Sequence, residues 1–475
     1  MFGKLDRTLN QPLYQQLMIL IKKKIQMGEL VAGDRLPSER QLSELLEVNR
    51  STVIRAYDEL AVEGVLTRKR GSGTLVSRET WLQTPRQLNW KKYLAVNEQV
   101  TTPATHYKKQ LQDKVQLNPS SIIDGYTGDL PQQMIPSFNL TEMKWHDFLA
   151  ASSDQEPFGL ISLRQALSNY INQQFGYKMK LEELLLTAGG QQSLFFIMNA
   201  LLQSGDTVAV EAPSYFYSLP MFDNYGIRTE AIPLDSEGIN LNYFEALLEY
   251  QAIKMLFVTP NYQNPTTITM SLERKKALVA LCERHQIIIV EDDVYGLLGY
   301  QDQHLPLLKS LSPDNVLYVG SLSKVLGKTI QLGWINAPSR VLEALIKVRE
   351  EWEQPLSIFP QMLVSQLMAA PEFSLLVANL RQELFQKVST LYQLVTSELA
   401  NQFSVNLPSG GYYLWLTYQG RLLTISDWQF LLEQNILVFP SFLLTEHAQS
   451  IRINVANLSE EQMKILVKAL KNHFE

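Results

Sequence analysis

The sequence predicts a multidomain protein in which a small α+β unit precedes a larger α/β unit with a mostly parallel sheet. The chain has 475 residues, roughly three times the length of a typical domain. The residues up to about 79 indicate helices followed by a short hairpin, whereas short apolar strands alternate with amphipathic helices from about 121 onward. We therefore divide the chain into residues 11–79, a linker of residues 80–120, and residues 121–475.

The composition excludes several classes of protein. Apolar residues make up 45% and charged residues 19%, as in folded globular proteins. No apolar run approaches the length of a membrane span, and MFGKLDRTLN lacks the apolar stretch of a secretory signal. The single Cys282 excludes a disulfide framework, and the six scattered histidines give no support for a metal site. We expect a cytoplasmic protein without a metal.

The two units differ in charge. The whole chain carries a net charge of −6, but residues 1–78 hold 13 Lys and Arg against 9 Asp and Glu, and the rest hold 29 against 39. A basic first unit on an acidic body suggests that the first unit alone binds a polyanion.

The first unit shows the pattern of a helix-turn-helix. An apolar stripe predicts a helix over residues 12–27, ending before Gly28. Ser38 and Gln41 form a capping box that starts a second helix running to about Glu47. Asn49 is the expected N-cap of a third helix, which ends near Gly64 and has a stripe made by Val53, Ala56, Tyr57 and Leu60.

Donors suited to DNA follow in the expected places. The first turn of the third helix presents Arg50, Ser51 and Thr52, with Arg55 one turn later. The hairpin LTRKRGSGTLV then carries Arg68, Lys69 and Arg70, which suit a phosphate backbone. An αα-hairpin in a core would look similar, but here the helix pair, the basic wing and the positive charge occur together.

The segment GDRLPSERQLSELLEVNRSTVIRAYDELAVEGVLTRKRGSGTLV closely resembles the GntR-type winged-helix domain. The resemblance implies binding of a double-stranded operator by a dimer. It also implies DNA contacts at Arg35, Ser38, Arg40, Arg50, Ser51, Thr52 and Gly71. Residues 80–120 are polar and without a sustained period, and we expect a linker that is partly helical around Trp81–Leu94.

The body places polar residues where its predicted strands end. The strand-like runs are LLLTA, TVAVEA, KMLFVT, IIIVEDD and NVLYVG, and LERKKALVALCERH is one of the intervening helices. TPNYQNP, EDDVY and SLSK follow three of these strands. Ligands of such sheets bind beyond the carboxyl ends of the strands.

These residues together describe a pocket for pyridoxal phosphate (PLP). Lys324 can form a Schiff base with an aldehyde, and Asp292 can pair with a protonated pyridine nitrogen. Tyr295 and Asn264 suit a ring hydroxyl, and Tyr215 suits stacking on the ring. The phosphate would be held by the helix start at Gly189, Gly190 and Gln191 and by the hydroxyls of Ser321 and Ser323. Each feature alone is ordinary, but five in this order at strand ends are strong evidence.

From about Ile122 onward the body resembles the class I aminotransferases of fold type I. The motifs that carry the resemblance are EPFGLISLRQAL, TAGGQQSL, EAPSY, TPNYQNPT, VEDDVY, GSLSK, LGW, PSGGYYLWL and IRINVAN. The resemblance implies the same PLP contacts, with Lys324 as the Schiff-base lysine, and makes Arg452 the partner of a substrate or effector carboxylate. Arg452 alternates with Ile451 and Ile453, so it faces away from them.

Two positions depart from that family. Gln331 stands where relatives usually carry a phosphate-binding arginine, and Lys328 is the nearby cation that can replace its charge. The usual NPTG motif ends here in Thr267, so we expect a different backbone shape beside Asn264.

The order of the parts resembles the MocR subfamily of GntR regulators over nearly the whole chain. It implies a bacterial, homodimeric transcription factor that is associated with the nucleoid when bound to DNA and senses PLP or a small amino compound through PLP. Two alternatives stay open: a working aminotransferase with an accessory DNA-binding domain, and a regulator that senses its ligand without PLP. Gln331 and the fused first unit favour a regulator over an efficient aminotransferase.

Overall fold

The computed structural model describes residues 5, 11–77 and 102–475, apart from gaps at 28, 70–72, 118–120, 139–142, 154, 302–305, 353–354 and 446. The chain separates into two compact units, residues 1–101 and 102–475, which we call the head and the body. Each is described by itself. The helix predicted around Trp81–Leu94 lies outside the described residues.

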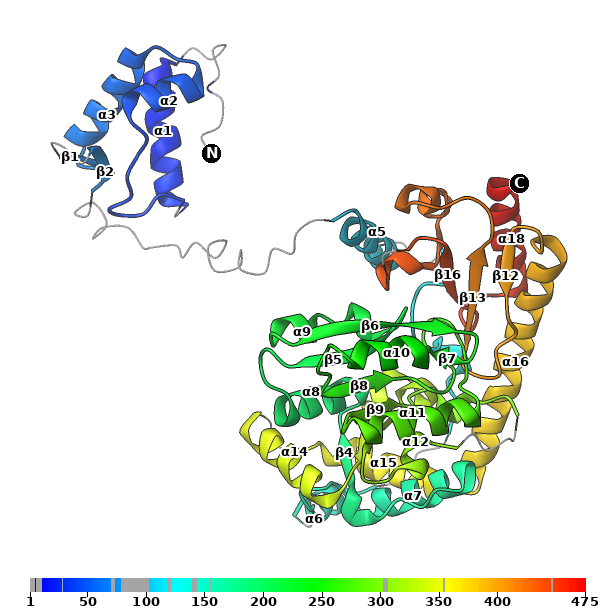
Figure 1. The fold of residues 1–475 in the computed structure, drawn as a ribbon. Coiled ribbons are helices and arrows are strands. Elements are labelled where there is room, and N and C mark those ends of the chain that lie inside the picture. Colours follow the sequence, from blue (N-terminus) through cyan, green and yellow to red (C-terminus); the bar gives the residue numbers. More distant parts are fainter. Residues whose placement is uncertain are drawn as a thin grey trace. The chain divides into compact units, whose positions relative to one another are not determined.

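The head is a three-helix unit closed by a hairpin, as predicted (Figure 1). Its elements are α1 (Leu13–Gln26), α2 (Glu39–Leu46), α3 (Arg50–Val62), β1 (Leu66–Lys69) and β2 (Gly73–Val76). The capping box of Ser38 and Gln41 starts α2, and the Asn49 side chain accepts a hydrogen bond from the Ser51 N–H to start α3. The antiparallel hairpin pairs Leu66 with Val76.

The core of the head is self-contained. Its buried residues all come from within the head: Leu17, Ile21, Leu36, Leu42, Leu46, Val53, Ala56, Tyr57, Leu60, Leu66 and Val76. The four residues predicted to form the stripe of the third helix are among them. The Tyr57 hydroxyl donates to the Pro37 carbonyl at 2.9 Å, which fixes the entry to α2 against α3.

The body is built on an eight-stranded sheet with the order β4-β11-β10-β9-β8-β5-β6-β7. Its strands are β4 (Leu184–Thr187), β5 (Thr207–Ala212), β6 (Arg228–Asp235), β7 (Gly238–Ile239), β8 (Met255–Val258), β9 (Ile288–Asp292), β10 (Val316–Ser321) and β11 (Gly333–Asn336). The strands from β10 to β6 run parallel, whereas β11 and β7 are antiparallel to their neighbours. The mostly parallel sheet is therefore confirmed.

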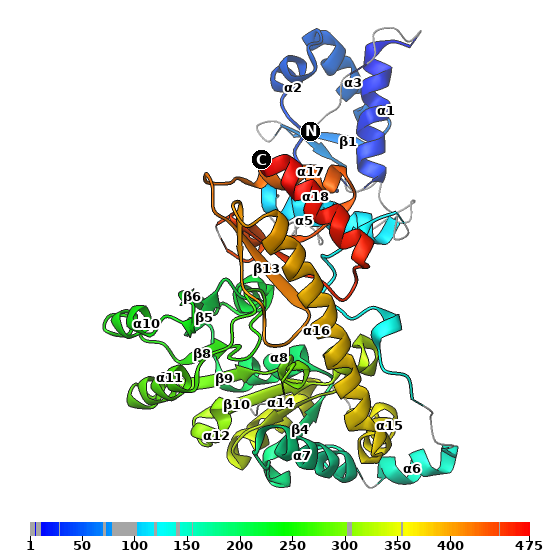
Figure 2. The ribbon, with the colours of Figure 1, turned by 90° about the vertical axis from the view of Figure 1, so that its right-hand side faces the viewer.

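Helices cover both faces of this sheet (Figures 1 and 2). Val208 and Val210 of β5 join a core with α8 and α14, whereas Ala209 between them joins a core with α10 and α11 on the other face. Burial on both sides explains why the central strands are continuous apolar runs. The helices of this layer are α7 (Ile161–Phe175), α8 (Gly190–Leu201), α9 (Pro220–Asn224), α10 (Leu241–Leu248), α11 (Leu272–Arg284), α12 (Leu308–Leu311), α13 (Ser323–Leu326) and α14 (Ser339–Trp352).

A smaller sheet completes the body. It has the order β12 (Phe403–Val405), β13 (Tyr413–Tyr418), β16 (Ser450–Asn454), β15 (Phe439–Pro440), and a separate pair joins β3 (Ile123–Asp124) to β14 (Ile436–Leu437). The long α16 (Glu372–Glu398) runs from the layer of the large sheet to this smaller one (Figure 2). The remaining helices are α5 (Pro103–Leu117), α6 (Trp145–Ser153), α15 (Ile358–Ala369), α17 (Gln429–Glu433) and α18 (Glu460–Phe474).

In the described part of the chain, no single helix is long and apolar enough to cross a bilayer. Only α15 and α16 taken together reach the required length and hydropathy, and a bend of 89° separates them.

The body begins earlier than the boundary at residue 121 that the sequence suggested. The predicted linker of residues 80–120 overlaps α5, which belongs to the body. The buried residues of α5 are Tyr107 and Leu111, which are four positions apart and pack into the core of the smaller sheet. Two apolar anchors on an otherwise polar helix give too weak a period to be recognised from sequence.

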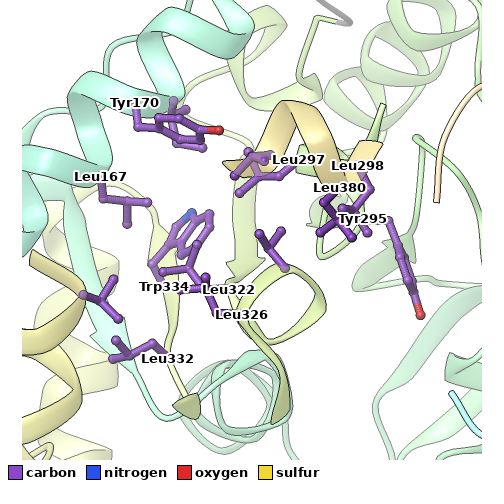
Figure 3. Close-up of a cluster of buried hydrophobic side chains, with 14 of the residues drawn as sticks. Leu167, Tyr170, Tyr295, Leu297, Leu298, Leu322, Leu326, Leu332, Trp334 and Leu380 are labelled. Atoms are coloured by element: carbon purple, nitrogen blue, oxygen red, sulfur yellow. The ribbon is translucent and has the colours of Figure 1, made fainter. Parts of the chain in front are cut away.

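A buried cluster includes residues of the turn that follows β10, and Figure 3 shows part of it. It contains Trp334 of β11 together with Leu322 and Leu326, which flank Lys324. Gly320 leaves the space for the indole ring, because a Cβ at Gly320 would lie 2.1 Å from a ring carbon of Trp334. This packing fixes the turn from which Lys324 projects.

Candidate functional site

The body contains a cavity of about 580 Å³ beyond the carboxyl ends of the central strands. It brings together all eleven residues predicted to bind a cofactor or effector: Gly190, Gln191, Tyr215, Asn264, Asp292, Tyr295, Ser321, Ser323, Lys324, Lys328 and Arg452. These residues come from segments spread over more than 260 positions of the chain. The cavity is therefore the candidate site.

Lys324 projects into the cavity from α13, immediately after β10. Its Nζ donates to the Gly128 carbonyl at 2.8 Å and lies 3.4 Å from Asp129 Oδ1. Asp129 also lies 3.5 Å from the Nζ of Lys328, so one carboxylate faces both amines. A primary amine on the wall of a cavity is a group that can react with an aldehyde.

Asp292, at the end of β9, supplies a buried carboxyl group on the cavity wall. Burial raises its pKa to about 7, although a hydrogen bond from the Val294 N–H and the nearby Lys324 act in the opposite direction. A cationic ring nitrogen beside Asp292 would favour the carboxylate form. The residue fits the role predicted for it.

A second buried acid, Glu211, lies at the end of β5. Its Oε2 accepts from the Thr259 N–H at 3.1 Å and from Gln263 Nε2 at 3.4 Å. Its Oε1 is buried and has no hydrogen-bond partner among the described residues. Burial raises the pKa of Glu211 to about 8, and the charge of Asp292 adds to that rise.

Three tyrosines join the wall around Lys324 to the segment at Gly128. The hydroxyls of Tyr295 and Tyr413 lie 3.0 Å apart, and Tyr412 and Tyr413 donate to the Gly128 carbonyl at 3.0 and 3.2 Å. The Nζ of Lys324 lies 5.7 Å from the centre of the Tyr295 ring. Burial raises the pKa of Tyr295 and Tyr412 well above the usual value, so both phenols are donors at neutral pH.

Another part of the cavity wall suits a phosphate group. The first residues of α8, Gly190 and Gln191, line it, with Gly189 as the N-cap at φ 98°. The Gln191 side chain donates to the Tyr215 hydroxyl at 2.6 Å, and the Ser323 N–H donates to Ser321 Oγ at 3.2 Å. A helix N-terminus with neighbouring hydroxyls and the amine of Lys328 forms an anion site.

The two positions that depart from the aminotransferase pattern both have left-handed backbones. Gln331 lines the cavity at φ 45°, and Thr267 has φ 64°. Thr267 thus adopts the left-handed conformation that glycine favours, and a β-branched residue carries the strain there. The expected difference in backbone shape beside Asn264 stays a prediction.

Arg452 reaches the cavity from β16 and is almost fully buried. Its guanidinium donates to Asn264 Oδ1 at 2.9 Å and to the Tyr126 carbonyl at 3.0 Å. The rings of Tyr413 and Phe439 lie 4.2 and 4.4 Å from its central carbon. Its buried Nε has no hydrogen-bond partner among the described residues, as expected of a group that binds an anion.

The head exposes part of its predicted DNA-binding set. Arg35, Arg40, Arg50, Ser51 and Arg55 are exposed, and Thr52 is half-buried. Within the described head, Arg35 and Arg50 form no ion pair. The Arg35 guanidinium lies against Gly73 of the hairpin, about 3.0 Å from where a Cβ would stand.

Several members of the set, exposed ones included, have partners inside the head. Arg68 pairs with Asp58 at 3.0 Å and with Glu39 at 3.6 Å, which ties the hairpin to α3 and α2. Arg55 lies over the ring of Tyr14 at 4.0 Å, and Arg40 pairs with Glu44. The hydroxyl of Ser38 donates to Gln41 and that of Ser51 donates to Asn49. Arg70 and Gly71 lie outside the described residues, as does the side chain of Lys69.

Sequence reasoning missed several residues of the cavity. Those that line it without having been predicted include Lys108, Tyr126, Gly128, Asp129, Tyr413 and Phe439. Tyr413 lies in the motif PSGGYYLWL, so its position in a family motif is a signal that could have identified it. Gly128 and Asp129 lie nearly 200 positions before Lys324 and follow a two-residue strand, so nothing local in the sequence marked them.

Two family models match the chain. Residues 127–470 match the family described as aminotransferase class I and II, and residues 13–76 match bacterial regulatory proteins of the gntR family. Among curated proteins, the chain is 30% identical to the uncharacterized HTH-type transcriptional regulator YdfD of Bacillus subtilis, covering 95% of this chain and 94% of YdfD. It is 25% identical to the HTH-type transcriptional regulator NorG of Staphylococcus aureus, covering 90% of this chain and 97% of NorG.

Solved structures with a similar fold include aminotransferases. The multiple substrate aminotransferase of Thermococcus profundus has a TM-score of 0.71 at 20% identity, covering 82% of this chain and 98% of that one. LysN, the α-aminoadipate aminotransferase of Thermus thermophilus solved with N-(5'-phosphopyridoxyl)-L-leucine, has a TM-score of 0.66 at 23% identity. It covers 82% of this chain and 98% of that one, and both likenesses support the fold.

Proposed function

Because the chain belongs to the MocR/GntR-type regulators, in which a gntR-family domain precedes a class I and II aminotransferase domain, we propose that it is a PLP-dependent transcription factor controlled by a small amino compound. The head would bind a double-stranded operator in the bacterial cytoplasm, and the body would bind the cofactor and effector and pair as a homodimer. The observation that carries the proposal is the convergence of eleven predicted residues on one cavity.

The cavity residues fit PLP from end to end. Lys324 Nζ would hold the aldehyde carbon, Asp292 the ring nitrogen, and Tyr295 with Asn264 the ring oxygen. Tyr215 would lie against the ring, and the start of α8, Ser321, Ser323 and Lys328 would hold the phosphate. Bound PLP supplies an aldehyde to which amines add and a ring that withdraws electrons. The ammonium group of Lys328 is a point charge, whereas a guanidinium group binds a phosphate through two parallel hydrogen bonds. We therefore expect weaker phosphate binding than an arginine at position 331 would give.

Arg452 is the proposed anchor for the effector carboxylate. A carboxylate at the guanidinium would satisfy the buried Nε and compete with Asn264 and Tyr126 for the remaining donors. Effector binding would also draw the amine of Lys324 away from its present contacts at Gly128 and Asp129. Two chain segments would thus change partners at once, which can shift a two-state equilibrium by the ligand's differential affinity.

The cofactor assignment is tested by borohydride reduction of the PLP-loaded full chain, followed by peptide mass mapping. The expected adduct lies on Lys324 and is lost in Lys324→Ala, whereas Lys328→Ala retains it. An adduct on another lysine, or none after incubation with PLP, contradicts the assignment and favours a regulator that senses its ligand directly.

The regulatory role is tested on the DNA that co-purifies with the protein, which identifies the operator. Operator affinity is then measured with and without candidate amines. A working aminotransferase is the second candidate, because Lys324, Asp292 and Arg452 line one cavity. Steady-state transamination with no effect of amines on operator affinity would favour that enzyme over the regulator.

A further inference from the structure

We propose that Lys108 selects effectors that carry a second acidic group, so that the pocket prefers an amino dicarboxylate. The inference rests on the proposed function, because it concerns the effector of the same cavity. Lys108 of α5 lines the cavity. The proposed function assigns it no contact with the cofactor or with the α-carboxylate of the effector.

The backbone that carries Lys108 is fixed beside the cavity. The neighbouring Tyr107 is buried, donates from its hydroxyl to the Trp428 carbonyl at 3.1 Å, and packs edge-on against Phe442 at 5.1 Å. One turn later, Leu111 is buried in the same core, and Lys114 donates to Asn435. The amine of Lys108 is therefore held on a rigid helix rather than on a loop.

The charges around the cavity favour an anion. Its lining has four cations, which are Lys108, Lys324, Lys328 and Arg452, against two acids, Asp129 and Asp292. Asp129 already faces the amines of Lys324 and Lys328. Lys108 is exposed and forms no hydrogen bond or ion pair with any residue that the structure describes. An unpaired ammonium on the wall of a ligand pocket attracts an acid and repels a cation.

Among the described residues that line the cavity, Lys108 is the one cation that has no role in the proposed function, so it is available to bind the distal end of the effector. Lys324 and Lys328 serve the cofactor, and Arg452 serves the α-carboxylate under the proposed function. Tyr126 and Phe439, whose rings stack at 5.4 Å, line the same cavity and offer an apolar surface for a short methylene chain. An amine with one carboxylate at Arg452 and a second at Lys108 would use all of these groups, whereas a neutral side chain would leave Lys108 solvated.

The test compares L-glutamate with its neutral isostere L-glutamine by calorimetric titration of the PLP-loaded full chain. We expect wild type to bind glutamate about 3- to 10-fold more tightly than glutamine, which is the range expected of an exposed charge-assisted hydrogen bond. Lys108→Gln should bring the ratio of the two affinities close to one, and Lys108→Glu should invert it. Lys109→Gln is the matched control, because Lys109 is an exposed neighbour on α5 outside the cavity lining, and it should keep the wild-type ratio.

The outcomes separate this inference from the function beneath it. Equal binding of both amino acids by wild type, or an unchanged ratio in Lys108→Gln, overturns the role of Lys108 while the pocket stands. Binding of neither amino acid by a chain that shows PLP absorbance overturns the inference alone, whereas no PLP absorbance removes the proposed function and the inference with it. Arg452→Gln should weaken both amino acids by a similar factor, and the PLP absorbance of each variant reports whether its cavity is intact.

Discussion

Replacing Glu211 with glutamine is expected to make the cofactor-free body less sensitive to alkaline pH. The Glu211 carboxyl is buried, and its Oε1 has no hydrogen-bond partner among the described residues. Glutamine keeps an oxygen for the Thr259 N–H and the Gln263 amide, and it places an uncharged amide where Oε1 now lies. The variant therefore resembles the protonated acid at every pH.

The magnitude follows from proton linkage. Burial raises the pKa of Glu211 from 4.5 to about 8 in the folded protein. Between those values the folded state holds a proton that the unfolded chain has released, so the free energy of unfolding falls as pH rises. The fall is about 1.4 kcal/mol per pH unit, reaches at most about 5 kcal/mol at pH 8, and does not continue above it. Glutamine has no such fall.

The assay is urea unfolding of the full chain without PLP, followed by tryptophan fluorescence. Five of the seven tryptophans lie in the body and none lies within residues 11–77 of the head, so the signal reports mainly on the body. The free energy of unfolding of Glu211→Gln minus that of wild type should rise by about 3 kcal/mol between about pH 5.5 and pH 8.5. Glu273→Gln, which removes a charge from the exposed start of α11, controls for net charge. A difference that does not change with pH would refute the reasoning.

Four further substitutions test the site and the head. Arg452→Gln should keep PLP absorbance but weaken carboxylate-bearing amines about 10- to 100-fold in calorimetry, because two charge-assisted hydrogen bonds are lost; an undiminished operator response would mean that the effector binds elsewhere. Arg50→Ala should relax the sequence preference at one base pair by about 1–3 kcal/mol, measured by competition between operator and random DNA. Arg68 is already paired with Asp58 and Glu39, so Arg68→Ala should change the slope of log affinity against log salt concentration by less than about one unit. Gly333→Ala should lower PLP affinity and stability, because its Cβ would lie 2.8 Å from the Gly189 backbone; equilibrium dialysis of PLP measures the first effect and urea unfolding the second.

The sequence carried enough information for the cavity because its residues follow strong local signals. Asp292 is the last residue of one buried strand, Lys324 comes three residues after another, and Gly190 opens a helix after a third. Once the strands are assigned to a parallel sheet, their carboxyl ends must lie on one edge. The helices of the head were equally accessible, because Ser38 and Asn49 mark their starts with capping side chains.

Contacts between distant segments were not accessible in the same way. The pairing of Lys324 with Gly128 and Asp129 depends on how the two-residue strand β3 pairs with β14, and no local pattern encodes that. Lys108 was hidden because α5 has only two buried apolar positions. The ion pairs of Arg68 depend on the packing of the hairpin against two helices, so composition alone suggested a free cation.

The self-contained core of the head has a genetic consequence. The buried residues that hold the head together all lie between Leu17 and Val76, and the cavity is lined only by residues of the body. Missense mutations in this protein should therefore fall into two classes that map to either side of residue 101. Substitutions in the core of the head should give loss-of-function alleles that no longer occupy the operator. Substitutions such as Arg452→Gln should give alleles whose product occupies the operator but no longer responds to the proposed amino effector.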